Sequence, residues 1–297
     1  MKHQVFTIPI PKLFSFAECL WFLDRNLDDC MHEVKDGYVR KLLDIKGKPV
    51  LIRISEIQKV LQVEVLYGTV ANTEAIISYI KEWFDLERDI RPFYALLKKD
   101  KDLSVLAEHY KRLHMVGIPN FFEALCWSII GQQINLQFAY RVKRRLVEQY
   151  GQCVTYENKK YYLFPEPEII STLRVDELRS FQLTQKKAEY ILTIAKRLTE
   201  GALSKQQIHN LPTEDEMIAS LVNIRGIGPW TANYTLMKSL RIMNCVPYGD
   251  AGIHHAVQKL KGIDKNNQAA IKALFDAFEG WKTYLVYYLW RSLREPE

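Results

Sequence analysis

Apolar residues alternate with polar ones, as they do in half-buried β-strands, only in the part of this chain that precedes Arg88. The alternating runs are residues 38–45, 50–54 and 61–67. Lys46-Gly47-Lys48-Pro49 predicts the turn between the first two runs. A capping box of Ser15 and Glu18 predicts a helix before the runs, and apolar residues at helical spacing over 73–84 predict one after them. This segment is expected to form a small antiparallel sheet that carries helices.

From about Arg88 onward the strand signals stop and helical segments follow one another. The predicted helices are residues 92–98, 102–114, 121–131, 135–150, 167–172, 175–180, 184–200, 213–223, 229–240, 251–260, 266–278 and 281–294. Since no repeat, low-complexity tract or flexible linker interrupts the chain, its two parts are expected to pack together. The predicted fold is α+β, with a small antiparallel α/β domain over residues 1–88 and a larger all-α domain over 89–297.

Composition excludes several classes of protein. Of the 297 residues 48% are apolar and 26% charged, which is typical of a folded soluble protein. The net charge of +6 permits a nucleic-acid partner without requiring one. The longest uncharged stretch, residues 124–140, is interrupted by glycine, glutamine and asparagine, so we expect no membrane span.

The cysteines and the N-terminal residues indicate a cytoplasmic protein. The five cysteines are an odd number and include no CxxC pair, which favours reduced thiols over disulfides, a zinc site or an iron–sulfur cluster. The seven histidines show no metal-ligand spacing. The first residues lack the apolar run and the small-residue cleavage site of a secretory signal.

The most informative motif is LVNIRGIGPWTANY, residues 221–234. A helix is expected to end near Asn223, Gly226-Ile227-Gly228 to form a tight turn, and Pro229 to occupy the first position of the next helix. The N–H groups of such a turn point outward and, with the helix dipole, suit a phosphate. The simpler interpretation is an ordinary helical hairpin with a glycine turn. The apolar spacing across the two helices favours a helix-hairpin-helix that holds a DNA backbone phosphate.

Asp250 follows a loop of Val246-Pro247-Tyr248-Gly249 and precedes an apolar-periodic run. By itself, an aspartate in this place is most simply a helix N-cap. Capping is compatible with catalysis, because a carboxylate at a helix N-terminus is held rigidly. Asp250 lies sixteen residues after Tyr234, the last residue of the hairpin motif, and this spacing makes it a candidate catalytic residue.

A helix-hairpin-helix followed by a Pro/Gly loop and an aspartate resembles the DNA glycosylases of base excision repair, and in particular those of the DNA-3-methyladenine glycosylase II (AlkA) type. Further segments that resemble this family are residues 121–133, 281–284 with 288–290, and 14–27. The resemblance covers nearly the whole chain and is most specific at the hairpin and Asp250. It implies a helical domain with a cleft between two lobes.

The resemblance also implies a mechanism. Such enzymes flip the target base out of the duplex, and a fixed carboxylate, here Asp250, assists the attacking water. Bifunctional relatives such as endonuclease III have a lysine nucleophile where this chain has Trp230, and an indole cannot form a Schiff base. A monofunctional hydrolase that leaves an abasic site is therefore expected. Lys238 is expected to be a solvated helix charge.

Aromatic side chains are expected to line the pocket of such an enzyme, because positively charged alkylated bases such as 3-methyladenine and 7-methylguanine are attracted to ring faces. The residues that match by position are Trp281, Tyr234, Trp230 and Phe22. Trp127 and Trp290 are expected in the core. No cofactor is expected, apart from a structural Na⁺ or K⁺ at the hairpin.

The same resemblance suggests which residues contact DNA. The phosphate would bind the amides of Gly226, Gly228 and Thr231, and the cation would bind the carbonyls of Val222, Ile224 and Ile227. The loop that enters the gap left by the flipped base corresponds to Gln132, Gln133 and Ile134. Gln133 stands where a leucine wedge is typical, so Gln133 or Ile134 could fill the gap. The basic clusters 143–145 and 186–187 are expected to be solvated helix faces rather than contacts to the DNA backbone.

Double-stranded DNA with damaged bases is thus the expected partner of a cytoplasmic monomer that needs no membrane and no obligate protein partner. Two alternatives remain open on the sequence. One is a non-catalytic helix-hairpin-helix DNA-binding module, which would need neither Asp250 nor an aromatic pocket. The other is a glycosylase for a neutral lesion such as hypoxanthine, whereas the absence of a lysine at position 230 speaks against an 8-oxoguanine enzyme of the lyase kind.

Overall fold

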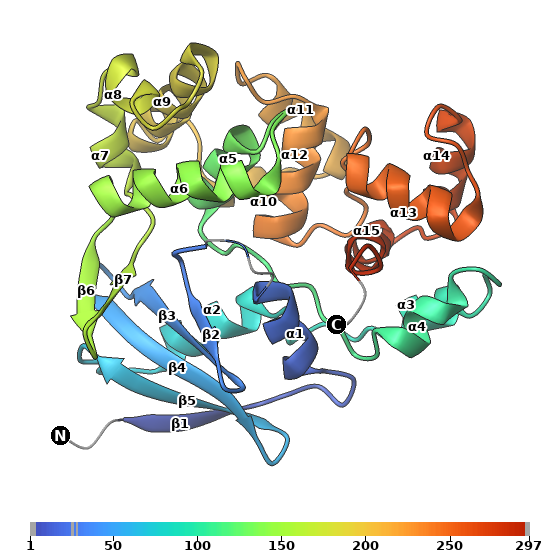
Figure 1. The fold of residues 1–297 in the computed structure, drawn as a ribbon, viewed down its shortest axis with the longest axis horizontal. Coiled ribbons are helices and arrows are strands. Elements are labelled where there is room, and N and C mark those ends of the chain that lie inside the picture. Colours follow the sequence, from blue (N-terminus) through green and yellow to red (C-terminus); the bar gives the residue numbers. More distant parts are fainter. Residues whose placement is uncertain (1–3, 25–26, 28, 295–297) are drawn as a thin grey trace.

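The computed structural model describes residues 4–24, 27 and 29–294, and places a five-stranded antiparallel sheet beside a larger body of helices (Figure 1). The strand order is β1-β5-β4-β3-β2. The strands are β1 (Val5–Pro9), β2 (Glu33–Lys35), β3 (Tyr38–Asp44), β4 (Pro49–Ile57) and β5 (Val60–Tyr67). The three central strands confirm the alternating runs, while β1 and β2 form the two edges and were not predicted.

Successive side chains of a strand point to opposite faces of the sheet, and the central strands carry apolar side chains on both faces. On one face Val50, Ile52 and Val63 join the main core, with helices α1 (Phe16–Leu23) and α2 (Glu74–Trp83). Ser15 caps α1 by accepting the N–H of Glu18, as predicted. The other face is covered differently, by a segment of the helical half of the chain.

That cover is a hairpin of β6 (Cys153–Tyr156) and β7 (Lys159–Tyr162). Its apolar side chains form a small separate core with residues of the central strands, made of Leu42, Leu51, Leu66, Val154, Tyr161 and Leu163. The Tyr161 hydroxyl also donates to Glu33 at 2.5 Å. The expectation that strands stop after Arg88 is therefore corrected. Each of these strands is four residues long, too short for the alternation to stand out.

Helices make up the rest of the chain. They are α3 (Arg91–Leu97), α4 (Ser104–His109), α5 (Phe121–Ile130), α6 (Leu136–Tyr150), α7 (Pro167–Ser171), α8 (Val175–Arg179), α9 (Gln185–Thr199), α10 (Lys205–His209), α11 (Glu214–Val222), α12 (Pro229–Thr235), α13 (Ala251–Lys261), α14 (Gln268–Asp276) and α15 (Lys282–Arg291). Only α10 lacks a predicted counterpart. A π-helical turn, Leu236–Leu240, continues α12. Every residue of α5 is buried, so α5 is the central helix of this body.

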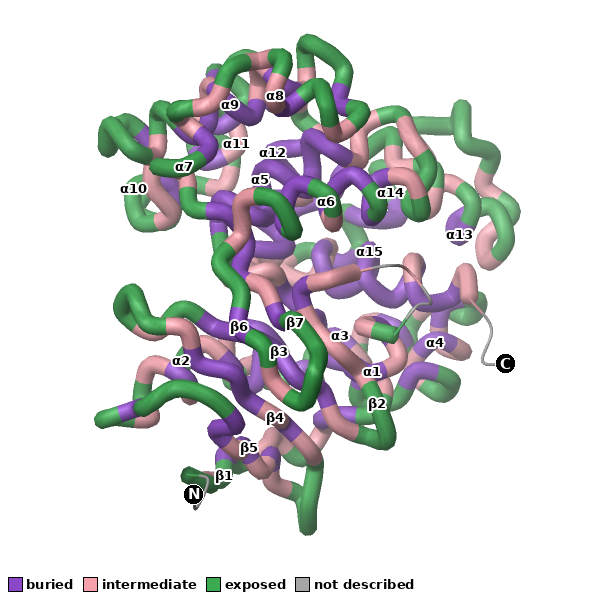
Figure 2. The backbone as a smooth tube through the Cα atoms, turned by 60° about the vertical axis from the view of Figure 1, so that its left-hand side comes forward, coloured by how far each residue is buried: buried purple, intermediate pink, exposed green. Residues whose placement is uncertain are grey.

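The two parts share one continuous core, which runs from the sheet through α5 to α15 (Figure 2). Polar contacts also join them: the Tyr284 hydroxyl donates to Asp85 at 2.9 Å and Arg291 donates to Glu18 at 3.0 Å. A ligand site at this junction is therefore built from both parts. No helix within the described ranges is long and apolar enough to cross a membrane.

Candidate active site

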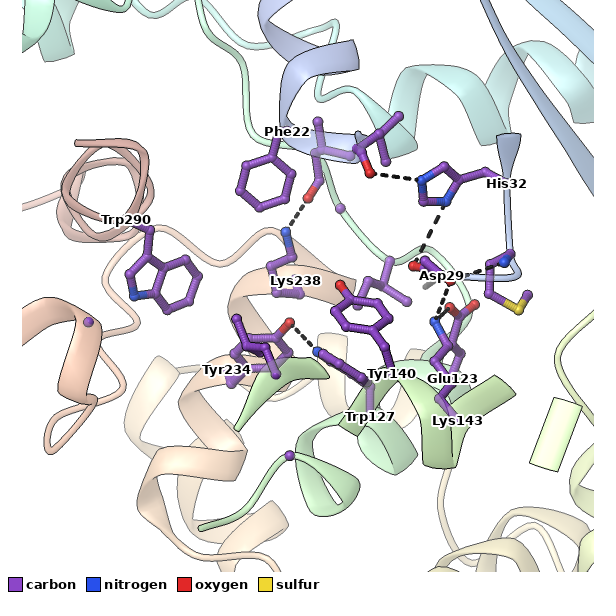
Figure 3. Close-up of a pocket in the computed structure, with 18 of the residues that line it drawn as sticks. Phe22, Asp29, His32, Glu123, Trp127, Tyr140, Lys143, Tyr234, Lys238 and Trp290 are labelled. Atoms are coloured by element: carbon purple, nitrogen blue, oxygen red, sulfur yellow. Dashed lines mark hydrogen bonds and ion pairs between the residues drawn. The ribbon is translucent and has the colours of Figure 1, made fainter. Parts of the chain in front are cut away.

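A cavity of about 430 Å³ lies at the junction of the two parts. Its walls come from α1 and the segment that leads to β2 on one side, and from α5, α6, α12, α13 and α15 on the other. Figure 3 shows Trp290 and Tyr234 toward one end, and His32, Asp29 and Lys143 toward the other. The volume falls in the range of small-ligand sites.

Asp250 lines the cavity at the Trp290 end. As the N-cap of α13, it accepts the N–H of Ile253 on Oδ1 at 2.9 Å. Two indole N–H groups also donate to it, from Trp290 to Oδ1 at 2.9 Å and from Trp230 to Oδ2 at 3.3 Å. Three neutral donors and a helix N-terminus thus hold one carboxylate in a fixed orientation. The predicted N-cap is confirmed, and its side chain faces a cavity.

Aromatic rings continue the wall from Asp250. Trp230 and Tyr234, one turn apart on α12, are stacked with ring centroids 5.2 Å apart and an interplanar angle of 15°. The Tyr234 hydroxyl accepts the indole N–H of Trp127 at 2.9 Å. Phe22 of α1 lines the same cavity and packs 4.5 Å from the ring of Tyr287. The structure therefore brings together three of the four predicted aromatic residues.

The fourth, Trp281, does not belong to the cavity wall. Its ring stacks on Phe93 at 6.0 Å and meets the edge of Tyr284 at 5.5 Å. Trp290 lines the cavity instead, which corrects the expectations for both tryptophans. The reason is their place on α15: Trp281 is the N-cap, with a non-helical φ of −142°, whereas Trp290 lies in the last turn of the helix. Trp127, also expected only in the core, is buried yet lines the cavity.

Lys238 is buried in the cavity wall, which corrects its interpretation as a solvated charge. Its ammonium group donates to the carbonyl of Val116 and lies 4.9 Å from the ring of Phe22 and 5.1 Å from that of Tyr287. The π-helical turn that contains Lys238 changes the register of side chains along the helix. A strict α-helical reading of residues 229–240 therefore misplaces this lysine.

At the far end from Asp250 the cavity is lined by five ionisable side chains, which we call the polar compartment. They are Asp29, His32, Lys41, Glu123 and Lys143. Lys143 donates to Glu123 at 2.8 Å and lies 3.5 Å from Asp29. Lys143 is thus buried rather than solvated, whereas Arg145 of the same cluster is exposed. Sequence reasoning missed the compartment because its members come from four separate segments.

In the polar compartment, burial and neighbouring charges shift the pKa values of Asp29 and Lys143 in opposite directions. Burial disfavours ionisation of Asp29, but the ammonium of Lys143 and further positive groups outweigh it and hold the pKa of Asp29 below its usual range. Burial likewise opposes the charge of Lys143, while Asp29 and Glu123 raise its pKa above the usual value. Burial lowers the pKa values of Lys41 and His32.

The predicted helix-hairpin-helix is formed by α11 and α12. Gly226 has a φ of +97°, and a Cβ there would lie 2.1 Å from the ring of Tyr190 on α9. A Cβ on Gly228 would meet no atom within 4 Å. The first glycine is therefore required by the fold of the chain itself, while the second leaves open space in front of the α12 N-terminus. Pro229 is the first helical residue, as predicted.

The loop between α5 and α6 is tied to this hairpin. The Gln132 side-chain amide donates to the Gly226 carbonyl at 3.2 Å and to the Thr231 hydroxyl at 3.0 Å. Lys187 of α9 donates to the carbonyls of Ile130 and Gln132 at 2.9 and 2.7 Å. Gln132, predicted to contact DNA, thus joins two loops of the protein.

The same loop presents three further side chains. Gln133 is exposed and has a φ of +56°. Ile134 is half-buried and lines the cavity, and so does Leu136, whose exposure of 46% is high for an apolar residue. The loop that is expected to enter the gap left by a flipped base therefore borders the cavity. Gln133 and Ile134 both stay candidates for the wedge.

Comparison with known proteins matches residues 126–281 to the HhH-GPD superfamily of base excision DNA repair proteins. A DNA-3-methyladenine glycosylase of Bacillus subtilis (strain 168) is 37% identical over 297 residues, covering 98% of each chain. The chain belongs to the HhH-GPD superfamily. The matched segment contains the hairpin, Trp230, Tyr234 and Asp250, but neither Trp290 nor the N-terminal side of the cavity.

Solved structures of low sequence identity share the fold of this HhH-GPD protein over nearly its whole length. A 3-methyladenine DNA glycosylase from Archaeoglobus fulgidus aligns with a TM-score of 0.84 at 23% identity, covering 96% of this chain and 97% of that one. An 8-oxoguanine glycosylase/lyase from Clostridium acetobutylicum aligns with a TM-score of 0.77 at 17% identity, covering 97% and 96%. The antiparallel sheet is therefore part of the shared architecture.

Among the residues that the structure describes, no three His, Cys, Asp or Glu side chains gather as metal ligands would. The candidate cation carbonyls of Val222, Ile224 and Ile227 lie at the hairpin, where the Ile224 carbonyl accepts the Ile227 N–H at 3.0 Å. A carbonyl oxygen has two lone pairs, so this bond leaves one for a cation. Backbone oxygens are ligands that suit a hard ion such as Na⁺ or K⁺.

Proposed function

We propose that this protein is a DNA glycosylase that removes alkylated bases such as 3-methyladenine and 7-methylguanine from duplex DNA. In this proposal the damaged nucleotide is flipped into the cavity, and water cleaves its N-glycosidic bond to leave an abasic site. The observation that carries the proposal is the Asp250 carboxylate, oriented by two indole N–H groups at the wall of an aromatic cavity. The name of the Bacillus subtilis relative agrees with it.

The chemistry follows from the geometry of Asp250. Cleavage of an N-glycosidic bond develops positive charge on the sugar, which a fixed carboxylate stabilises. Oδ1 already accepts two hydrogen bonds, while Oδ2 accepts the longer one from Trp230. A carboxylate oxygen can accept two hydrogen bonds. Oδ2 is therefore the atom that we assign to orienting the attacking water.

The rings beside Asp250 suit a positively charged base. A cation placed over an aromatic face gains about 0.5–2 kcal/mol, depending on how far it is desolvated. Trp230, Tyr234 and Trp290 lie within reach of one another, with Tyr234 between the two tryptophans at 5.2 and 6.1 Å. An alkylated purine carries the charge that these faces attract and needs little further activation to leave.

DNA would be held at the hairpin and at the loop beside it. The first N–H groups of a helix have no partner within the helix. We therefore assign the phosphate to the amides of Gly226, Gly228 and Thr231, with Na⁺ or K⁺ at the neighbouring carbonyls as a bridge. Gln133 and Ile134 stay the candidates for the wedge. The hairpin, the cation carbonyls and the wedge loop all belong to one chain, so we propose that a monomer binds double-stranded DNA.

Water, rather than a lysine, is the proposed nucleophile, because Trp230 occupies the first turn of α12. Lys238 favours a bifunctional enzyme as the alternative, since this buried amine lines the same cavity. A Schiff base would form between a lysine amine and the sugar, and would lead to a strand break.

The test is base release from methylated duplex DNA, with the released bases identified by chromatography. The proposal expects 3-methyladenine and 7-methylguanine, and a strand break only after alkali. Undamaged DNA is the control. Binding without release would favour the non-catalytic module, and release of hypoxanthine alone would favour the neutral lesion. A break before alkali that Lys238→Met abolishes would show that Lys238 is the nucleophile.

A further inference from the structure

The polar compartment holds buried charged side chains that neither the hairpin nor Asp250 requires. Two carboxylates and two ammonium groups are placed there out of bulk water, at the wall of the cavity. Removing charges from water costs free energy that ion pairing only partly recovers. Ionisable groups with perturbed pKa values that line a cavity are typical of ligand sites. Moreover, Asp29, His32 and Lys41 lie outside the segment matched to the HhH-GPD superfamily.

The hydrogen bonds of His32 define its tautomer. Its Nε2 lies 3.2 Å from the carbonyl oxygen of Leu23, and because a carbonyl can only accept, Nε2 carries the hydrogen. Burial lowers the pKa of His32, against the opposing effect of Asp29, which favours the neutral ring. The Nδ1 atom also stands 3.9 Å from the Asp29 carboxylate, farther than the hydrogen bond that a protonated Nδ1–H would make to it. In a neutral ring with hydrogen on Nε2, Nδ1 is an acceptor.

This acceptor faces another acceptor. His32 Nδ1 lies 3.9 Å from Oδ2 of Asp29. The Asp29 carboxylate is bound on its other oxygen, since Oδ1 accepts the Met31 N–H at 3.0 Å and lies 3.5 Å from Lys143. Two acceptors cannot bond to one another. A nitrogen placed between them can lie at about 2.9 Å from both, which is the usual hydrogen-bond length.

We propose that His32 Nδ1 and Asp29 Oδ2 together bind an N–H donor on the flipped base, and that they select bases with an exocyclic amino group. The inference rests on the proposed function and narrows its substrate class. 3-Methyladenine carries such an amino group on C6. 7-Methylguanine carries one on C2, beside a carbonyl on C6, so it would present its other edge to the two acceptors. Hypoxanthine has a carbonyl oxygen in place of the adenine amino group, and that oxygen would face two acceptors without a hydrogen between them.

The selection is a matter of pairing buried acceptors. An amino group offers two hydrogens, one for each acceptor, whereas hypoxanthine offers a single N1–H beside its carbonyl, so at least one acceptor stays unpaired. Sites built to pair a polar group discriminate strongly against an analogue that lacks it. One charged hydrogen bond corresponds to a difference of about tenfold or more in affinity.

The test is calorimetric binding of two free bases to the full-length protein: 3-methyladenine, and 3-methylhypoxanthine, in which a carbonyl and one ring N–H replace the amino group. The wild type is expected to bind 3-methyladenine at least about tenfold more tightly. In His32→Gln the side-chain amide still reaches the Leu23 carbonyl as a donor but lacks the Nδ1 acceptor, and the preference is expected to fall to about threefold or less. His255→Gln, at an exposed position on α13, is the control that keeps the preference.

Equal affinity of the wild type for the two bases, or no binding of either, overturns the inference, as does an undiminished preference in His32→Gln. The affinities of the wild type for the two bases test the inference even if His32→Gln does not fold. The proposed function fails separately: a protein that prefers the amino base but releases none from methylated DNA keeps this site and is not the proposed enzyme.

Discussion

At the scale of single residues, Asp250 combines structural and chemical roles. Its Oδ1 caps α13 and accepts from Trp290, while its Oδ2 accepts from Trp230. The carboxylate is therefore oriented before a substrate arrives, which is the condition for electrostatic stabilisation at low reorganisation cost. In the proposed function the Trp290 ring faces the base, while its N–H positions Asp250.

Trp290→Phe tests this positioning. The variant keeps an aromatic ring in the cavity and removes the N–H that orients Asp250 at 2.9 Å. We expect single-turnover base release to slow by about tenfold, in line with a hydrogen bond to a charged group, with DNA affinity unchanged. Trp281→Phe, at the other end of α15, is the matched control and should retain full activity. Equal effects of the two substitutions would contradict the assignment.

Prediction from sequence succeeded at residue scale where a motif fixes both identity and position. The resemblance that starts from the hairpin placed Asp250, Trp230 and Tyr234 in the site, and all three line the cavity, while their roles stay predictions. Trp290 and Lys238 were not placed there, because the side of a helix that faces the cavity depends on packing and, for Lys238, on a π-helical turn. The polar compartment depends on contacts between segments as far apart as Asp29 and Lys143.

At the scale of elements, the hairpin shows how two glycines in one motif differ. Gly226 has a positive φ and lies against Tyr190, whereas Gly228 has a φ of −89° and open space beyond it. The first glycine is needed for folding, and the second leaves the space that the proposed phosphate contact requires.

The two alanine substitutions separate these roles. Gly226→Ala is expected to lower the free energy of unfolding by about 1–3 kcal/mol or more, through overpacking and backbone strain. Gly228→Ala should cost at most about 1 kcal/mol, as a poorer N-cap, but should weaken binding to duplex DNA. Denaturant unfolding and fluorescence anisotropy measure the two effects. A Gly228→Ala variant with wild-type DNA affinity would refute the phosphate site.

Elements were predictable where they are long and periodic. The helices around the hairpin and the three central strands were located from the sequence, whereas the edge strands β1 and β2 and the β6–β7 hairpin were not. Short strands have few residues over which alternation can show. The β6–β7 hairpin is stabilised by Leu42, Leu51 and Leu66 of the sheet, contacts that no local pattern reveals.

At the scale of the whole molecule, the polar compartment joins the two parts of the chain. Lys143 of α6 pairs with Glu123 of α5 and with Asp29 of the N-terminal part. Such a buried network contributes little net stability when complete, but removing one member leaves charges unpaired. The junction is thus sensitive to single substitutions.

Lys143→Met is expected to lower the free energy of unfolding by about 3–5 kcal/mol, because Asp29 and Glu123 lose their partner. Arg144→Met is the neighbouring control: its pair with Glu148 lies near the surface and should contribute about 0–1 kcal/mol. Chemical denaturation of both variants measures the difference. Similar losses would show that the buried pair is not the cause.

Acid should weaken the same junction. The pKa of Asp29 is held below its usual value in the folded protein, so the stability it contributes is present above about pH 4, its ordinary pKa. That stability is lost as the pH falls from there toward the folded pKa. Asp29→Asn should therefore be less stable at neutral pH, and its free energy of unfolding should fall less steeply as the pH drops below about 4. An identical acid slope in both proteins would contradict this assignment.

The variant Asp250→Asn tests whether Asp250 catalyses base release. Asparagine is also a good N-cap, so α13 should stay intact. Single-turnover release of 3-methyladenine and 7-methylguanine is predicted to fall by about 10²–10⁴-fold, while affinity for the same DNA stays within about threefold. Asp264→Asn, at an exposed aspartate, is the control. A variant that releases bases at the wild-type rate, or loses release only in proportion to binding, would contradict the account.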